Sequence, residues 1–355
     1  MLTYLIILLD DTSVSYCHYE VTAKEHRLMP LDVLKRGIVW AMKENVNVQF
    51  VYPDYPLPQE YNELIETIDH TKIKPEAQAD GADVVVLTEW KERISNCAEG
   101  ATCIIHASRQ ELADNIENVK RLIAMAARVN VVLTDVEIFT DSDTEEYKEL
   151  LQRLSDHIVE QYAQGLSAQL NLITDRLVID YMNNCGAGSM TVTLAPDGHF
   201  YICPAYYVVG NASKRYNQTQ SLEASPTTGQ LSQSLEASPT TGQLSQSLEA
   251  SPTTAIGGLT TGLAIANSHL FHLDYAPICR VCDAYHCRRC IWMNDRLTGD
   301  VNTPSHQQCV VSHLERNASR RLQQKMMAAG IRLKGTKEIP EVDYLDPFVI
   351  ATRWK

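Results

Sequence analysis

The sequence predicts an α/β protein in which an N-terminal domain of strand–helix repeats precedes a cysteine-rich α+β domain. Three observations support this fold class. Apolar, β-branched runs alternate with amphipathic segments over the first 180 residues. Four of the ten cysteines fall between positions 279 and 290, and 355 residues are enough for two domains. We therefore expect domains at 1–180 and 181–330, with residues 331–355 as a C-terminal surface strap.

Strands are expected where short runs are apolar on both faces. Such runs are typical of a buried parallel sheet, because helices cover both of its sides. The N-terminal domain is thus predicted to be a reduced part-barrel or an open parallel sheet. The expected strands are 4–9, 46–52, 82–88, 102–106 and 131–139.

Amphipathic helices are expected between these strands, the first over 31–45. A second helix follows Ser108, which forms a capping box with Glu111. A third starts after Asp143 and continues to residue 158. In the C-terminal part, Ser305 is expected to cap a helix of about five turns.

Residues 221–254 contain a thirteen-residue unit that occurs twice in full and begins a third time. Each unit holds two leucines, one proline and many hydroxyl groups, too little apolar surface to offset the ordering of the chain. We therefore expect a disordered insertion over 219–256. A short β-solenoid is the alternative, because repeats of fixed period are typical of solenoids.

Charge and hydropathy exclude several classes of function. The formal net charge of −13 disfavours binding to nucleic acid, whose phosphates repel an acidic chain. The apolar start of the chain lacks the basic residues of a signal peptide, and no apolar run is long enough to span a bilayer. We expect a cytoplasmic protein that does not enter membranes.

The distribution of the cysteines predicts a metal centre. Cytosolic disulfides rarely persist, so crowded cysteines in such a protein usually bind metal. The densest part has the spacing C-x2-C-x4-C-x2-C, and a predicted hairpin with a Pro-Asp-Gly turn returns the chain from Cys185 to Cys203. The candidate ligands, for a metal or cofactor, are Cys185, Cys203, Cys279, Cys282, Cys287, Cys290 and Cys309.

The order of these cysteines resembles the SPASM domain, the auxiliary iron–sulfur region of radical-SAM peptide maturases. More narrowly, residues 277–290, 302–309 and 313–317 resemble the CXXX repeat peptide maturase family. This resemblance implies [4Fe–4S] clusters and work beside a radical-SAM maturase on a ribosomally made cysteine-repeat peptide. It is specific from Cys185 to Asn317, without the repeat insertion. The last two gaps of the cysteine run are each one residue shorter than in typical SPASM domains.

The resemblance also implies how the ligands divide. Cys279, Cys282, Cys287 and Cys309 would hold one cluster, and Cys185, Cys203 and Cys290 three corners of a second. The family's fourth ligand lies just upstream of Cys185, where residues 180–184 contain no cysteine. The second site would then be open to a substrate thiolate, take another ligand such as His286, or be absent.

Other features limit the function further. The chain lacks the C-x3-C-x2-C motif of radical-SAM enzymes, so we expect no self-sufficient radical-SAM activity, and no catalytic residue is assigned. Zinc is the alternative metal, because it takes the same thiolates, and the protein would then be a zinc-stabilised module that recruits the peptide.

His313 follows Cys309 by one helical turn and is expected to support the site by a hydrogen bond rather than as a ligand. Cys17, Cys97 and Cys103 are interpreted as ordinary buried thiols.

Overall fold

The computed structural model describes residues 2–94, 96–182, 184–210 and 255–342. Within these residues, eight strands form one sheet in the order β6-β5-β4-β3-β2-β1-β7-β8. All neighbours are parallel except β7 and β8, which form an antiparallel hairpin. The strands are β1 Tyr4–Leu8, β2 Asn47–Val51, β3 His70–Pro75, β4 Val84–Leu87, β5 Thr102–Ala107, β6 Arg128–Leu133, β7 Thr191–Leu194 and β8 Phe200–Tyr201.

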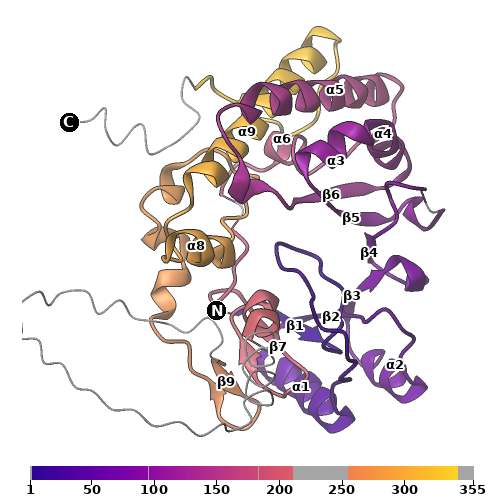
Figure 1. Cartoon of the computed structure of the whole chain (residues 1–355), viewed down its shortest axis with the longest axis vertical. Coiled ribbons are helices and arrows are strands. Elements are labelled where there is room, and N and C mark those ends of the chain that lie inside the picture. Colours follow the sequence, from indigo (N-terminus) through magenta and orange to yellow (C-terminus); the bar gives the residue numbers. More distant parts are fainter. Residues whose placement is uncertain (1, 95, 183, 211–254, 343–355) are drawn as a thin grey trace, which may run out of the picture.

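The sheet is the part-barrel of an α/β protein, which confirms the predicted fold class. It curves from β6 at the top of Figure 1 to β1 and β7 at the bottom, and the orange segment of residues 255–300 lies along its open side. Helices cover the convex face: α1 Leu31–Glu44, α2 Gln59–Ile65, α3 Arg109–Asp114, α4 Ile116–Met125 and α5 Asp143–Ala163. The later helices are α6 Asp175–Val178, α8 Ile291–Thr298 and α9 His306–Ala328, and β9 Gly257–Gly258 pairs with β10 Gly262–Leu263.

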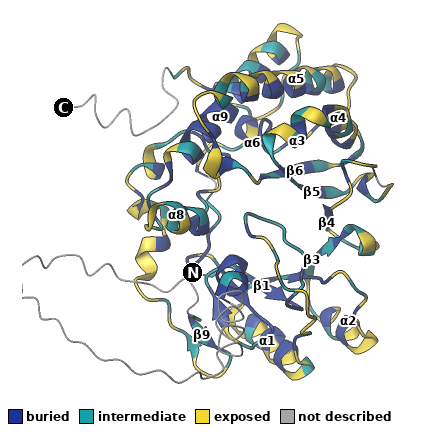
Figure 2. Ribbon diagram, viewed as in Figure 1, coloured by how far each residue is buried: buried dark blue, intermediate teal, exposed yellow. Residues whose placement is uncertain are grey.

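Alternate residues of each central strand belong to different cores. In β1, Leu5 and Ile7 pack under α1 and α2, whereas Ile6 and Leu8 point to the concave face. This alternation follows from the two-residue period of a strand. Figure 2 shows the result, since the sides of the helices toward the sheet are dark blue and their outer sides are yellow. Both faces of the central strands are buried, as the apolar runs predicted.

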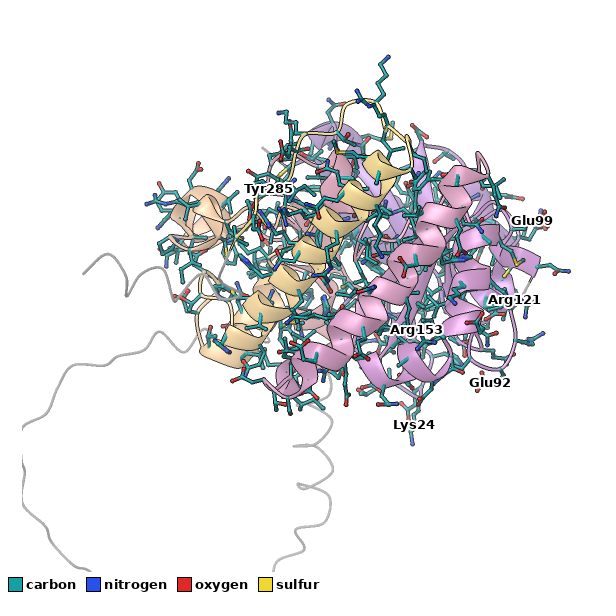
Figure 3. The ribbon with its side chains drawn as sticks, turned by 90° about the horizontal axis from the view of Figure 1, so that it is seen from above. Lys24, Glu92, Glu99, Arg121, Arg153 and Tyr285 are labelled. Atoms are coloured by element: carbon teal, nitrogen blue, oxygen red, sulfur yellow. The ribbon has the colours of Figure 1, made fainter. Side chains whose placement is uncertain are left out.

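Helix α9 joins the cysteine-rich part to the α/β part. It lies beside α5, and Figure 3 shows the two helices next to each other from above. The Tyr147 hydroxyl of α5 donates to Oε1 of Glu315 on α9 at 2.7 Å, and both residues are buried. The domain boundary at residue 180 remains a prediction, and β7, which follows it, pairs with β1 in the same sheet.

Several local predictions are confirmed and others are wrong. Ser108 and Glu111 form the capping box, and the Ser305 side chain caps α9. The strand predicted at 131–139 instead covers Arg128–Leu133, because Thr134 and Asp135 start a turn. β3 was missed because His70–Pro75 carries two lysines and no continuous apolar run. The helix after Ser108 is interrupted at Asn115, and the third helix begins at Asp143 itself.

The repeat at 221–254 lies outside the described residues, and so does the end of the strap. The described part of the strap, residues 331–342, forms no helix or strand and buries Ile339, whose backbone N–H donates to Gln323 of α9 at 3.0 Å. Among the described helices, none has the length and apolar character needed to cross a bilayer.

Candidate metal centre

Four of the candidate ligands line one small cavity between the cysteine-rich loop and the start of α9. We call them the first thiol group: Cys279, Cys282, Cys287 and Cys309. Cys279 and Cys309 are buried, the other two are half-buried, and His313, Arg289 and Ser312 complete the wall. Cys309 lies at least 22 positions (309 − 287) from the other three, so only the docking of α9 brings it to this cavity.

Polar groups around the first thiol group are placed to donate to sulfur. The Ala284 N–H donates to Sγ of Cys282 at 3.4 Å, and Nε2 of His313 lies 3.4 Å from the same sulfur. The Ser312 hydroxyl bonds to Cys287 and lowers its pKa, although burial has the larger effect and raises it. Burial likewise raises the pKa of Cys279 and of Cys282 to about 12. His313 therefore lies against a thiol, and its support of the site by a hydrogen bond rather than as a ligand stays a prediction.

Arg289 directs neighbouring cysteines to different places. It is a buried non-glycine residue with a φ of 45°, in the left-handed region that reverses the course of the backbone. Its guanidinium donates to Asn302 Oδ1 and to the Phe271 carbonyl, both at 2.7 Å. As a consequence Cys287 faces the first thiol group, whereas Cys290 packs on the concave core of the sheet.

The remaining three candidates meet beside that core. The backbone N–H of Cys185 donates to the Arg288 carbonyl at 2.8 Å, and its thiol lies 3.9 Å from the Arg289 carbonyl oxygen. Cys203, at the end of the β7–β8 hairpin, packs with Cys185 against Phe271 and Ile291, and with Cys290 against the concave core. The structure thus brings all seven candidates together as two adjoining sets.

A fourth thiol that the sequence analysis set aside lies in the second set. Cys17 is half-buried in the loop after β1 and packs on the same core as Cys203 and Cys290. Burial raises its pKa well above the usual value, and the nearby thiols of Cys203, Cys290 and Cys185 raise it further. We call Cys17, Cys185, Cys203 and Cys290 the second thiol group. Cys17 was missed because it is 168 residues before Cys185 (185 − 17) and belongs to no spacing motif.

The alternative ligand His286 has a different partner. Its Nε2 lies 3.1 Å from Oε2 of Glu315, and both side chains are buried. Within the described parts of the chain, no three His, Cys, Asp or Glu side chains are grouped closely enough for a single metal ion.

A larger cavity, of about 870 Å³, opens beyond the carboxyl ends of β4, β5 and β6. Its wall includes Thr88 and Thr134 after β4 and β6, and Trp292 from α8. Charged side chains of both signs line it: Glu20, Lys91, Glu111, Glu137 and Arg296. The carboxyl ends of parallel strands are the usual place for ligands in α/β folds.

Comparison with known proteins shows which solved structures this fold resembles. No family model and no curated protein sequence matches the chain. Among solved structures, it is similar to anSMEcpe. With bound AdoMet and Kp18Cys peptide, that structure gives a TM-score of 0.54 at 12% identity and covers 92% of this chain and 99% of its own. A hexahistidine-tagged form with bound AdoMet gives 0.55 at 13%, with 93% and 100% covered. At this identity the likeness shows a shared fold and no more.

Proposed function

We propose that this chain is an iron–sulfur protein that assists the maturation of a ribosomally made cysteine-repeat peptide beside a separate radical-SAM enzyme. The observation that carries the proposal is the first thiol group, four cysteines from two segments that line one cavity. The resemblance of their spacing to the CXXX repeat peptide maturase family supports the peptide class. The fold shared with anSMEcpe supports the same assignment.

The chemistry of the donor set fits an iron–sulfur cluster. Thiolates are the ligands of both clusters and zinc, and the resemblance of the cysteine order to the SPASM domain favours the cluster. A bound cluster would supply one-electron transfer or an iron that binds a thiolate. The protein's own part is to hold the sulfurs and to donate hydrogen bonds to them, which the Ala284 N–H and His313 are placed to do.

The need for a partner follows from the sequence. The chain lacks C-x3-C-x2-C, so we assign cleavage of S-adenosylmethionine to a separate protein. One anSMEcpe structure holds a bound Kp18Cys peptide, and we infer that this chain also binds a peptide. Its site would be the 870 Å³ cavity, whose wall holds the ion pairs Lys91–Glu111 and Arg296–Glu137 beside the buried Trp90 and Trp292.

Metal analysis tests the cluster. The full chain is purified anaerobically, and iron, labile sulfide and zinc are measured per chain together with the visible absorption spectrum. Iron and sulfide in similar amounts, with a brown colour, are expected. A colourless protein that carries zinc would overturn the iron–sulfur assignment and favour the zinc-stabilised recruitment module.

Peptide binding tests the cavity. Fluorescence anisotropy with a labelled synthetic peptide of Cys-Xaa-Xaa-Xaa repeats is measured for Thr88→Trp, which fills the cavity mouth, and for the control Thr260→Trp. Both threonines are exposed, and Thr260 lies in the turn between β9 and β10, away from the cavity wall. We expect at least a tenfold loss of affinity for Thr88→Trp alone, about 1.4 kcal/mol. Equal affinity for the two variants would place the peptide elsewhere.

A further inference from the structure

The loop after β1 brings a cysteine to the three thiols for which the sequence offers no fourth partner. Residues 180–184, just upstream of Cys185, contain no cysteine. In the structure, Cys17 packs on the concave core together with Cys203 and Cys290, and Cys203 in turn packs beside Cys185. Four thiols from four segments of the chain therefore converge on one side of the sheet.

The backbone around Cys17 is held in place by hydrogen bonds to the end of β2. The Ser13 hydroxyl donates to the Val51 carbonyl at 2.9 Å, and the Val14 N–H donates to the Tyr52 carbonyl at 2.9 Å. On the other side of Cys17, the Tyr19 N–H donates to the Cys17 carbonyl at 2.9 Å, and the Tyr19 ring is buried in the concave core. The position of Cys17 is thus defined by the sheet.

The surroundings of Cys17 suit a metal ligand better than an isolated buried thiol. Cys17 is half-buried and packs against the same core as Cys203 and Cys290. A cysteine with only a structural role does not need other cysteines beside it, whereas Cys17 shares this site with three of them. Soft thiolate donors in this number select iron–sulfur clusters or zinc, and the proposed function favours a cluster.

We propose that Cys17 is the fourth ligand of a second iron–sulfur cluster, which Cys185, Cys203 and Cys290 hold at its other corners. This inference rests on the iron–sulfur assignment made above and goes beyond it. With four protein ligands the second cluster has no open iron for a substrate thiolate. It would also link the α/β part to the cysteine-rich part through a bond that neither forms alone.

The test compares Cys17→Ala and Cys17→Ser with the control Cys97→Ala in the full chain after anaerobic reconstitution. Cys97 is also half-buried, but it packs in the core under α3 and α4, away from both thiol groups. Iron, sulfide and the electron paramagnetic resonance spectrum are measured. We expect both Cys17 variants to lose about half of the iron, or one iron with the appearance of a [3Fe–4S] signal, while Cys97→Ala matches the wild type.

A second measurement does not depend on the folding of a variant. The wild-type protein is alkylated with iodoacetamide before and after its iron is removed by a chelator, and labelled cysteines are identified by mass spectrometry. Cys17 should be protected only while iron is bound, and Cys97 should react equally in both states. Iron-loaded protein in which Cys17 reacts freely, or Cys17 variants with unchanged iron and spectrum, would overturn the inference. A wild type without iron would instead refute the proposed function.

Discussion

The guanidinium of Arg316 on α9 is fully buried and donates through Nε to both carboxylate oxygens of Asp283, at 3.0 and 3.2 Å. Asp283 directly follows Cys282, and its carbonyl accepts a further bond from Nε of Arg176 at 2.6 Å. The loop that carries Cys279, Cys282 and Cys287 is thus held between α6 and α9. Figure 3 shows Tyr285, from the same loop, beside α9.

Loss of the Arg316 side chain should strongly destabilise the protein. Arg316→Ala leaves the Asp283 carboxylate without its main partner, and removal of one member of a buried ion pair costs about 3–5 kcal/mol. Asp283 is 22% exposed, so we expect the lower end of this range in urea unfolding. The control Arg36→Ala removes an exposed pair with Asp32 and should cost less than about 1 kcal/mol. Similar costs for the two variants would show that the buried pair does not hold the loop.

Replacement of His313 should change the redox properties of the first site without loss of iron. His313→Phe removes the contact with Cys282 Sγ, and fewer hydrogen bonds to sulfur lower the reduction potential of a cluster. We expect a potential more negative by tens of millivolts in a spectroelectrochemical titration. His306→Phe, an exposed position on the same helix, serves as control. A drop in iron content for His313→Phe would identify this histidine as a ligand.

A methyl group at Gly188 should disturb the wall of the second site. Gly188 has a φ of 73°, and an added Cβ would lie 2.7 Å from Cγ of Phe271, whose carbonyl binds Arg289. Gly100→Ala is the matched control, with a φ of 65° and nothing within 4 Å of the new carbon. Both variants strain the backbone, but the clash should make Gly188→Ala less stable by about 1–3 kcal/mol more. Equal melting temperatures would mean that Phe271 moves freely.

The capping box before α3 predicts a pH-dependent contribution to stability. The Glu111 carboxylate accepts from Lys91 and from the Ser108 N–H, both at 2.8 Å, and these contacts lower its pKa from the usual 4.5. A lowered folded-state pKa stabilises the protein above the unfolded value and loses this effect as the pH falls through the folded value. Glu111→Gln should therefore be destabilising at pH 7, and its difference from the wild type should shrink below pH 4.5.

Ser108→Ala is the non-titrating comparison for this prediction. It removes the hydroxyl that accepts from the Glu111 N–H, at a cost of about 1 kcal/mol. Because the hydroxyl does not titrate in the acidic range, its cost should persist at low pH. Thermal unfolding at a series of pH values measures both variants, and a Glu111→Gln deficit that is constant with pH would contradict the assigned ionic role.

Local signals in the sequence were enough for much of the fold. Apolar runs identified β1, β2, β4 and β5 because strands covered by helices on both sides need no polar face. The same reasoning failed for β3, whose lysines interrupt its apolar pattern, and misplaced β6, whose buried and half-buried residues alternate. Helix caps were readable at Ser108 and Ser305 because a cap is a contact between residues three positions apart.

By itself, the sequence determined the α/β class and a group of seven candidate cysteines, since strand periodicity and close spacing are properties of neighbours along the chain. The family resemblance implied how the seven thiols divide, and the tertiary structure shows what separates them: Arg289 turns Cys287 and Cys290 to different sites, and the docking of α9 brings in Cys309. Only the tertiary structure adds Cys17, from the loop after β1. These contacts join residues that are far apart in the sequence, and no local sequence pattern predicts that they lie close together in space. It arises from the curvature of the sheet and the packing of its helices.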